Sequence, residues 1–301
     1  MKPEFCAGIE QNLTERKLIP LDKSWIIRMG VLDFLNGRVA DTIQFLEGQN
    51  ELGGDLQALH RAALVWESNL PIDVGESATL YRFLRFTSLK LGLNKEFIKR
   101  GTLLGRELYE SPGIEKFSLE ELAQLKTSQW VSAAILLGNE EQVESLQFKS
   151  RLTHEALEHW QEQRAKGQMW LPRYDQTIMN QAMSFMNLMR GGELDFTPEQ
   201  AEDYCFARVF GVMTKVEGEV CWPSLHDHES DRLEEMETMV KRAELGLVVN
   251  SGDHRVVQAI AMKQMIKGEE IEVTDASVVN KSWPQFWRFL AYVRSGDLIP
   301  K

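Results

Sequence analysis

The chain has 301 residues, of which 43% are hydrophobic, so it is long enough for two domains with cores of their own. Its formal net charge of -11 argues against a nucleic-acid backbone or an anionic membrane as partner, because both would repel it. Any site for an anion must therefore be built locally.

The three cysteines, Cys6, Cys205 and Cys221, are odd in number and lack the spacing of metal ligands. They predict neither a disulfide framework nor a metal centre, and they indicate a reducing compartment. The first residues, MKPEFCAGIEQ, lack the apolar core of a signal peptide, and no apolar run has the length of a membrane span. We therefore expect a cytoplasmic protein.

Seven amphipathic patterns along the chain each open with polar residues and close with a glycine, which predicts seven helices. Their apolar parts, each ending at its glycine, cover residues 26–37, 80–92, 130–138, 178–191, 206–218, 233–246 and 257–268. Such a regular series indicates internal repetition.

Short alternating stretches between these helices are interpreted as strands, the clearest being Glu270–Thr274 with a period of two. A last helix is expected after Ser282, which with Gln285 would form a capping box, and the charged segment 158–167 is expected to form a loop. Repeated helix and strand modules predict a repeated α/β architecture.

Basic residues recur at the expected helix starts, and Arg232, Arg255 and Lys281 are the densest group. A helix N-terminus exposes unpaired N–H groups and the positive end of the helix dipole, so a basic side chain there adds to an anion site. These residues predict a site for a small molecule that carries phosphate and carboxylate groups.

Six motifs resemble, in the same order, those of the 5-enolpyruvylshikimate-3-phosphate synthase family. They are Asp22-Lys-Ser24 with Arg28, Val74-Gly-Glu-Ser-Ala-Thr79 with Arg82, Thr127-Ser-Gln129, Glu229-Ser-Asp-Arg232-Leu, Asp253-His-Arg255 and Lys281-Ser-Trp-Pro284. The resemblance implies a shortened α/β fold of two domains, each built from repeated βαβαββ units in an inside-out barrel. Residues 21–171 would form the shikimate-phosphate side, residues 1–20 with 172–301 the second domain, and the cleft between them the active site.

The resemblance also implies an activity without cofactor or metal, in which phosphoenolpyruvate donates its enolpyruvyl group to the 5-hydroxyl of shikimate 3-phosphate and phosphate is released. Asp203 would take the hydroxyl proton, while Glu229 and Lys23 would move the proton of the methylene carbon. Phosphoenolpyruvate would be held by Lys23, Arg82, Arg100, Arg232, Arg255 and Lys281. Shikimate 3-phosphate would be held by Ser24, Arg28, Thr127, Ser128, Gln129, Ser150, Arg151 and Asp203.

The chain departs from the family pattern at three positions. Glu76 replaces an asparagine and Ala78 a glycine in the second motif, and His228 stands where the family commonly has lysine. These changes, with segments missing from the chain, motivate an alternative: a relative that binds an anionic metabolite or a partner protein without turnover. A sister enzyme acting on UDP-N-acetylglucosamine fits less well, because that branch has asparagine at the position of Ser24. His226 and His228 could instead be metal ligands, but two histidines without a third ligand are more typical of a loop.

Overall fold

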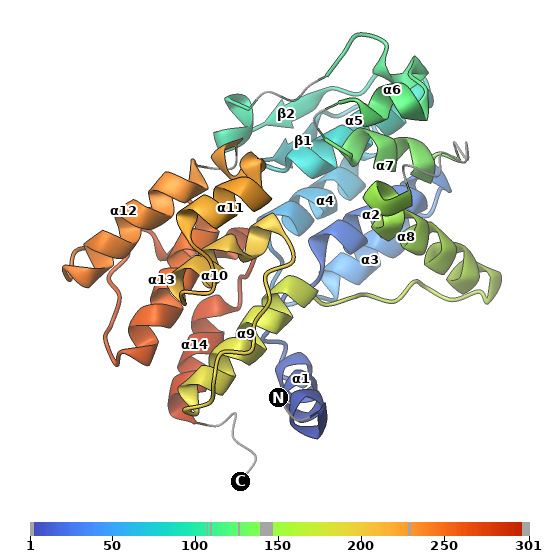
Figure 1. Ribbon diagram of the computed structural model, residues 1–301. Helices are drawn as coiled ribbons and strands as arrows, with labels where there is room; N and C mark the ends of the chain where they lie inside the picture. Colours follow the sequence, from blue (N-terminus) through green and yellow to red (C-terminus); the bar gives the residue numbers. More distant parts are fainter. Residues whose placement is uncertain are drawn as a thin grey trace. The chain divides into compact units, whose positions relative to one another are not determined.

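The computed structural model describes residues 3–106, 108, 110–125, 127–138, 147–227 and 230–296. The chain divides into two compact units (Figure 1). Unit 1 combines Met1–Pro20 with Tyr174–Lys301, and unit 2 is Leu21–Arg173. The sequence predicted domain boundaries after residues 20 and 171, and the structure divides the chain after residues 20 and 173.

Two backbone hydrogen bonds join the segments at which the chain passes from one unit to the other. The amide of Asp22 donates to the carbonyl of Arg173 at 2.8 Å, and the amide of Asp175 donates to the carbonyl of Pro20 at 2.9 Å. The first and last residues of unit 2 are therefore held next to each other.

Unit 2 is built around α2 (Lys23–Leu35), which is buried from Trp25 to Phe34. A helix that is apolar on every side belongs inside a core, and five other helices of the unit contact α2. The other elements of unit 2 are α3 (Val39–Glu47), α4 (Gly54–Val65), β1 (Ile72–Gly75), α5 (Ala78–Lys90), β2 (Phe97–Lys99), η1 (Gly101–Leu104), η2 (Ile114–Lys116), α6 (Leu119–Ala123), α7 (Gln129–Leu136) and α8 (Gln147–Ala165).

A buried carboxylate, that of Asp33 on α2, fixes several elements of unit 2 to one another. It accepts hydrogen bonds from Thr42 Oγ1 at 2.9 Å, Trp160 Nε1 at 2.8 Å and Trp170 Nε1 at 2.9 Å. Arg164 Nη2 lies 2.7 Å from the same carboxylate and supplies the balancing charge. A fully buried charge is tolerated when all its acceptor positions are used in this way.

Unit 1 is helical and is organised around α13 (His254–Ile266), most of whose residues are buried. Its N-terminal helix α1 (Pro3–Glu15) packs against α9 (Gln176–Met189) and places Ile9 and Leu13 in the core of this unit. The remaining elements are η4 (Ala201–Asp203), α10 (Tyr204–Val209), α11 (Lys215–Cys221), η5 (Pro223–Asp227), α12 (Arg232–Glu244), η6 (Ala276–Lys281) and α14 (Phe286–Ser295).

The predicted fold class is wrong. Among the described residues, the only sheet is the parallel pair β1–β2, so neither repeated βαβαββ units nor an inside-out barrel is present. A parallel strand covered on both faces needs a continuous apolar run. The alternating stretch at 270–274 is instead exposed or half-buried, and it forms a single parallel bridge, between Val249 and Val273.

Six of the seven predicted helices are confirmed: α2, α5, α7, α9, α12 and α13. Each is followed by its expected glycine in a left-handed conformation, for example Gly37 at a φ of 65° and Gly246 at 67°. A glycine there lets the chain turn without the steric penalty of a side chain. The polar-start, glycine-stop pattern therefore predicted helices correctly but did not reveal what lies between them.

Three local predictions are wrong. The helix expected over 206–218 ends at Val209, and Gly218 lies inside the separate helix α11. The charged segment 158–167, expected as a loop, lies mostly within α8, where its apolar positions contact the core of unit 2. Ser282 does not cap α14, because its hydroxyl accepts a hydrogen bond from Gln258 Nε2 at 3.1 Å instead.

No helix in the described part of the chain combines the length and the apolar character that crossing a membrane would require.

Candidate functional site

The guanidinium group of Arg28 is buried among hydroxyl groups in unit 2. Its Nε donates to Thr153 Oγ1 at 2.9 Å, its Nη1 to the carbonyl of Ser24 at 2.8 Å, and its Nη2 to Ser132 Oγ at 3.4 Å. Burial lowers the pKa of Arg28 to about 10, although the charge of Asp22 opposes the shift. Arg28 is thus a buried cation whose hydrogen-bond partners are neutral.

Arg82, on α5, is buried beside the same part of unit 2. Its Nη1 donates to Gln129 Oε1 at 2.5 Å, and Gln129 Nε2 donates in turn to Thr79 Oγ1 at 2.7 Å. The amide of Gln129 is therefore oriented by partners on α5, with its oxygen toward the guanidinium.

One face of α7 connects these two arginines. Gln129 and Ser132 are three residues apart on this helix and therefore project from the same side. Arg28 reaches that side from α2 and Arg82 reaches it from α5. We call Arg28, Arg82, Gln129, Ser132 and Thr153 the arginine–hydroxyl cluster.

The other basic residues predicted in unit 2 contact carboxylates. Lys23 Nζ lies 2.8 Å from Asp55 Oδ2, Arg100 Nη2 lies 3.0 Å from Asp73 Oδ2, and Arg151 Nε lies 2.8 Å from Glu155 Oε1. Arg100 and Arg151 are exposed, with 62% and 80% of their side chains accessible. Exposed ion pairs of this kind contribute little to stability and leave no net positive charge for a ligand.

Asp73 has a lowered pKa. Burial alone would raise the pKa of this carboxyl, but the amide of Gly75 and the guanidinium groups of Arg100 and Arg61 outweigh that effect. Asp73 therefore stays charged and keeps Arg100 beside β1.

The remaining predicted residues of unit 2 lie close to the arginine–hydroxyl cluster in sequence. Thr127 Oγ1 accepts from the amide of Gln129 at 3.3 Å, and Ser128 is the N-cap residue of α7. Ser150 is buried on α8, three residues before Thr153. The two hydroxyls that bind Arg28, Ser132 and Thr153, were not predicted, although each follows a predicted residue by one helical turn.

Glu76 is engaged by a residue of its own unit, because Thr102 Oγ1 donates to its carboxylate at 2.8 Å. A Cβ at Gly101, whose φ is 48°, would lie 2.1 Å from Glu76 Oε1. Glu76 is thus packed against the backbone of η1, and Ala78 is the first residue of α5.

In unit 1, Arg232 and Asp253 form a buried ion pair between the starts of α12 and α13. Arg232 Nε donates to Asp253 Oδ2 at 2.8 Å and its Nη2 to Oδ1 at 3.3 Å. Asp253 is also the N-cap of α13, since its Oδ1 accepts from the amide of Arg255 at 2.9 Å. Asp253 therefore neutralises Arg232, a role that the sequence analysis did not assign.

Arg255, in the first turn of α13, is only 5% exposed. Its Nε and Nη1 have no hydrogen-bond partner among the described residues. Leaving buried donors of a charged group unpaired is costly. The start of α13 therefore brings a guanidinium group and the positive end of a helix dipole together.

Of the two acidic residues predicted as proton carriers, Asp203 lies among the described residues. Asp203 is buried at the end of η4, where Gln181 Nε2 donates to it at 2.9 Å and the amides of Glu199 and Gln200 at 3.0 and 3.2 Å. It thus organises the turn before α10. Glu229, with His228, lies outside the described residues.

Lys281 is the last residue of η6 and is half-buried, and η6 packs against α13. The adjacent Ser282 accepts a hydrogen bond from Gln258, which lies one turn after Arg255 on α13. Within unit 1 the structure therefore brings Arg232, Arg255 and the segment of Lys281 to the elements around α13.

The histidines do not form a metal centre among the described residues, where no three side chains of histidine, cysteine, aspartate or glutamate are grouped closely enough to hold an ion. His226 Nδ1 instead lies 2.7 Å from Asp231 Oδ2.

Comparison with known proteins finds no match to the chain: no family model, no curated protein and no solved structure resembles it.

Proposed function

We propose that the chain transfers the enolpyruvyl group of phosphoenolpyruvate to the 5-hydroxyl of shikimate 3-phosphate or a close analogue, with release of phosphate. The observation that supports this proposal best is the buried guanidinium of Arg255, whose Nε and Nη1 lack partners among the described residues. The order of the six motifs is the second support.

Arg255 suits the carboxylate or phosphate of phosphoenolpyruvate. A guanidinium group can form two parallel hydrogen bonds to either group, and such charge-assisted pairs are stronger than neutral ones. The amides at the start of α13 would add to the attraction. Because Asp253 already balances Arg232, Arg255 supplies the uncompensated positive charge of this segment.

The arginine–hydroxyl cluster suits the phosphate of the acceptor. Hydroxyl groups hold Arg28 without cancelling its charge, and they could themselves donate to phosphate oxygens. A phosphate bound there would offset the desolvation that lowers the pKa of Arg28.

The reaction adds a hydroxyl group across the enol carbon and then expels phosphate, so it needs a base, an acid and fixed positive charges. Asp203, Glu229 and Lys23 remain the proposed proton carriers. Three donors engage Asp203, and because a carboxylate has about four acceptor positions, one remains to accept the hydroxyl proton.

A turnover assay tests the activity directly: purified chain is given both substrates, and phosphate and the enolpyruvyl product are measured. We expect both to appear in equal amounts. Absence of product from a sample that binds both substrates would remove the proposal.

The binding step is tested separately with Arg255→Met. We expect the affinity for phosphoenolpyruvate to fall by at least about tenfold, while the free energy of unfolding stays equal or rises because buried unpaired donors are removed. Arg242→Met is the matched control, since Arg242 is a partly buried arginine of the same unit whose Nε donates to the carbonyl of Val248 at 2.9 Å. Equal affinity of both variants would contradict the role of Arg255.

A second candidate function is binding of an anionic metabolite without turnover. It is favoured by the ion pair of Lys23 with Asp55, which engages one proposed proton carrier, and by the three donors around Asp203. Calorimetry separates the candidates, because a binder retains affinity for phosphoenolpyruvate in a sample that forms no product.

A further inference from the structure

Two hollows lie side by side on unit 1, where α12 and α13 end. The larger, here called the acidic hollow, encloses about 700 Å³. The smaller, called the lysine groove, encloses about 350 Å³. Ala243, Glu244 and Gln264 line both, so the two form one continuous surface.

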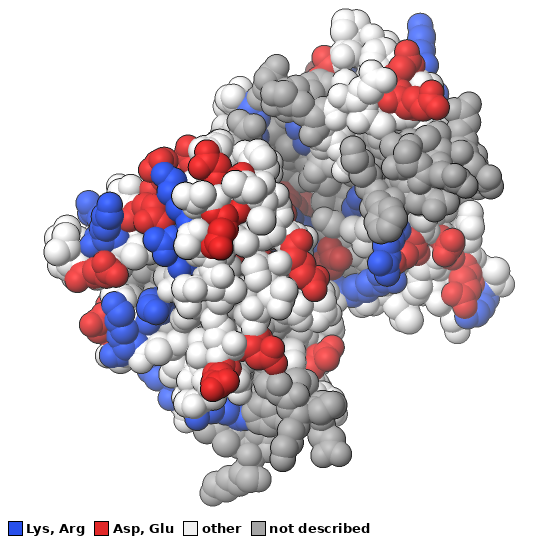
Figure 2. Space-filling view, in the orientation of Figure 1, with Lys and Arg blue, Asp and Glu red and all other residues white. Residues whose placement is uncertain are grey.

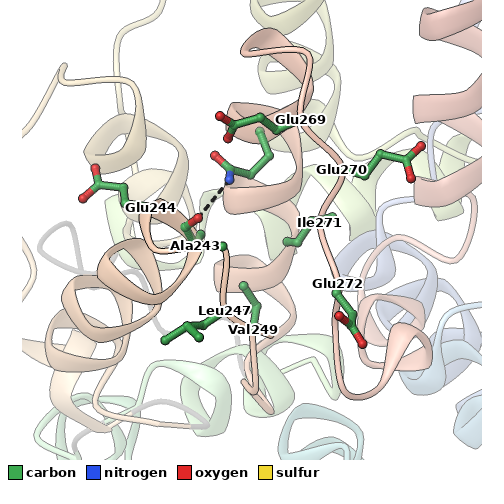
Figure 3. A pocket seen from close by; sticks show the side chains of 10 residues that line it. Ala243, Glu244, Leu247, Val249, Glu269, Glu270, Ile271 and Glu272 are labelled. Carbon is green, nitrogen blue, oxygen red and sulfur yellow. Dashed lines mark hydrogen bonds between the residues drawn. The ribbon is translucent and has the colours of Figure 1, made fainter.

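The acidic hollow carries carboxylates around an apolar floor (Figure 3). Glu244 comes from the end of α12, and Glu269 and Glu272 come from the extended segment after α13. None of these three carboxylates forms an ion pair with a described residue. Leu247 and Val249 lie between them in the view. The fourth carboxylate, Glu270, is different, because Arg294 Nη1 lies 3.0 Å from it.

The lysine groove is mainly basic, although Glu244 lines it as well. Lys241 of α12 and Lys263 and Lys267 at the end of α13 line it, and in the described part of the chain none of them forms an ion pair. The arginine of this groove, Arg208, is already paired with Glu237, at 2.6 Å between Nε and Oε1. The three lysines therefore carry positive charges without an ion pair to a described residue, and Lys263 Nζ lies 5.4 Å from the centroid of the Phe210 ring.

The two hollows meet at Glu244, which lines both of them. Gln264 Nε2 of α13 donates to the carbonyl of Ala243 on α12 at 3.2 Å, between the two hollows. This bond fixes one helix end against the other. Figure 2 shows basic and acidic side chains interspersed over the region of α12.

Large apolar side chains are exposed on the same segments. Leu245, which follows α12, is 74% exposed, Leu247 is 49% exposed, and Ile266 at the end of α13 is 38% exposed. An apolar group bordered by charges is typical of a surface that another protein covers.

We propose that this face joins two copies of the chain about a twofold axis. In a twofold contact the same patch occurs on both partners, so it must be complementary to itself. An acidic hollow beside a lysine groove meets that condition, because rotation by half a turn places each hollow opposite the other copy's groove. The exposed leucines then pack near the axis.

Sedimentation equilibrium of the full chain tests the proposal. At concentrations between about 1 and 100 µM we expect the mass to rise toward that of two 34.6 kDa chains. Adding salt to about 0.5 M should weaken the association, because the charge pairs would be screened. A chain that stays a single copy at every concentration in low salt would overturn the proposal.

Charge reversal identifies the surface. Lys263→Glu with Lys267→Glu makes both hollows acidic, and Glu269→Lys with Glu272→Lys makes both basic. We expect each double variant alone to dimerise at least about tenfold more weakly than the natural chain. An equimolar mixture of the two should restore the dimer as a mixed pair, since each hollow again faces the opposite charge.

Lys90→Glu with Lys116→Glu is the matched control, because it changes the net charge equally on exposed lysines of unit 2. It should leave the dimer of the natural chain intact. Circular dichroism confirms that every variant is folded. Dimers that persist in both reversed variants, or a mixture that stays monomeric, would show that these hollows do not form the contact.

Discussion

Asp33 and Arg28 lie on the same buried helix, α2, and their charges are stabilised in different ways. Asp33 accepts from three neutral donors and has an arginine, Arg164, beside it. Within the described part of the chain, Arg28 donates only to hydroxyl and carbonyl groups, and the carboxylate of Asp22 acts on its charge without accepting a hydrogen bond from it. The first arrangement holds a fold together, and the second leaves a charge for a ligand.

Replacing Asp33 should therefore affect stability more than binding. We expect Asp33→Asn to lower the free energy of unfolding by roughly 3 kcal/mol, because an amide brings new donors toward Trp160 and Arg164 and removes the charge. Urea denaturation measures the change. Asp41→Asn is the control: Asp41 also contacts Arg164, at 2.9 Å, but is more exposed and should cost about 1 kcal/mol or less. Equal losses in the two variants would contradict this account.

The hydrogen bond of His226 to Asp231 predicts a pH-dependent stability. That bond raises the pKa of His226, and the charge of Glu219 acts in the same direction. A base whose pKa is raised by folding stabilises the folded state fully below its ordinary value of 6.5 and loses that contribution as pH rises through the raised pKa. Because Asp231 caps α12, the effect should be felt at the start of that helix.

We expect His226→Gln to be less stable than the natural chain near about pH 5 and equally stable near about pH 9. Thermal denaturation across this range checks the difference. His154→Gln, at another exposed histidine, is the control. If the difference in stability between His226→Gln and the natural chain were the same at every pH, the charge of the imidazole would not contribute to stability.

Among the elements, α11 shows how packing can decide the position of a glycine. Gly218 suggested a helix end from sequence, yet it lies inside α11 because a Cβ there would be 2.3 Å from Cε2 of the buried Tyr204. The glycine lets the helix approach that ring. Sequence pattern alone does not distinguish a glycine that ends a helix from one that allows close packing.

Gly218→Ala should therefore destabilise the chain by about 1 to 3 kcal/mol, although alanine favours helices. Gly8→Ala, within α1, is the control, because its Cβ would meet nothing within 4 Å. That variant should be stabilised by about 0.5 to 1 kcal/mol. Chemical denaturation of both variants measures the difference in sign, and stabilisation of both would refute the packing argument.

At the scale of the whole molecule, local patterns predicted the helices well and the fold class poorly. Caps such as Asp22 and Asp253 act through adjacent residues, so their effect can be predicted from the sequence. Strand pairing depends on distant segments, and the stretch at 270–274 finds only Val249 as a bridging partner. The contacts of Arg28 with Ser132 and Thr153 join residues more than a hundred positions apart, so they could not be predicted from local sequence patterns either.

The position of α1 has a consequence for how the chain folds as it is made. Ile9 and Leu13 belong to a core that, apart from these two residues, Leu18 and Ile19, is encoded after residue 177. During synthesis the first helix must therefore wait for its neighbours, while the whole of unit 2 emerges and can fold behind it. The apolar side chains of Ile9 and Leu13 therefore stay open to water until the later part of unit 1 has been made.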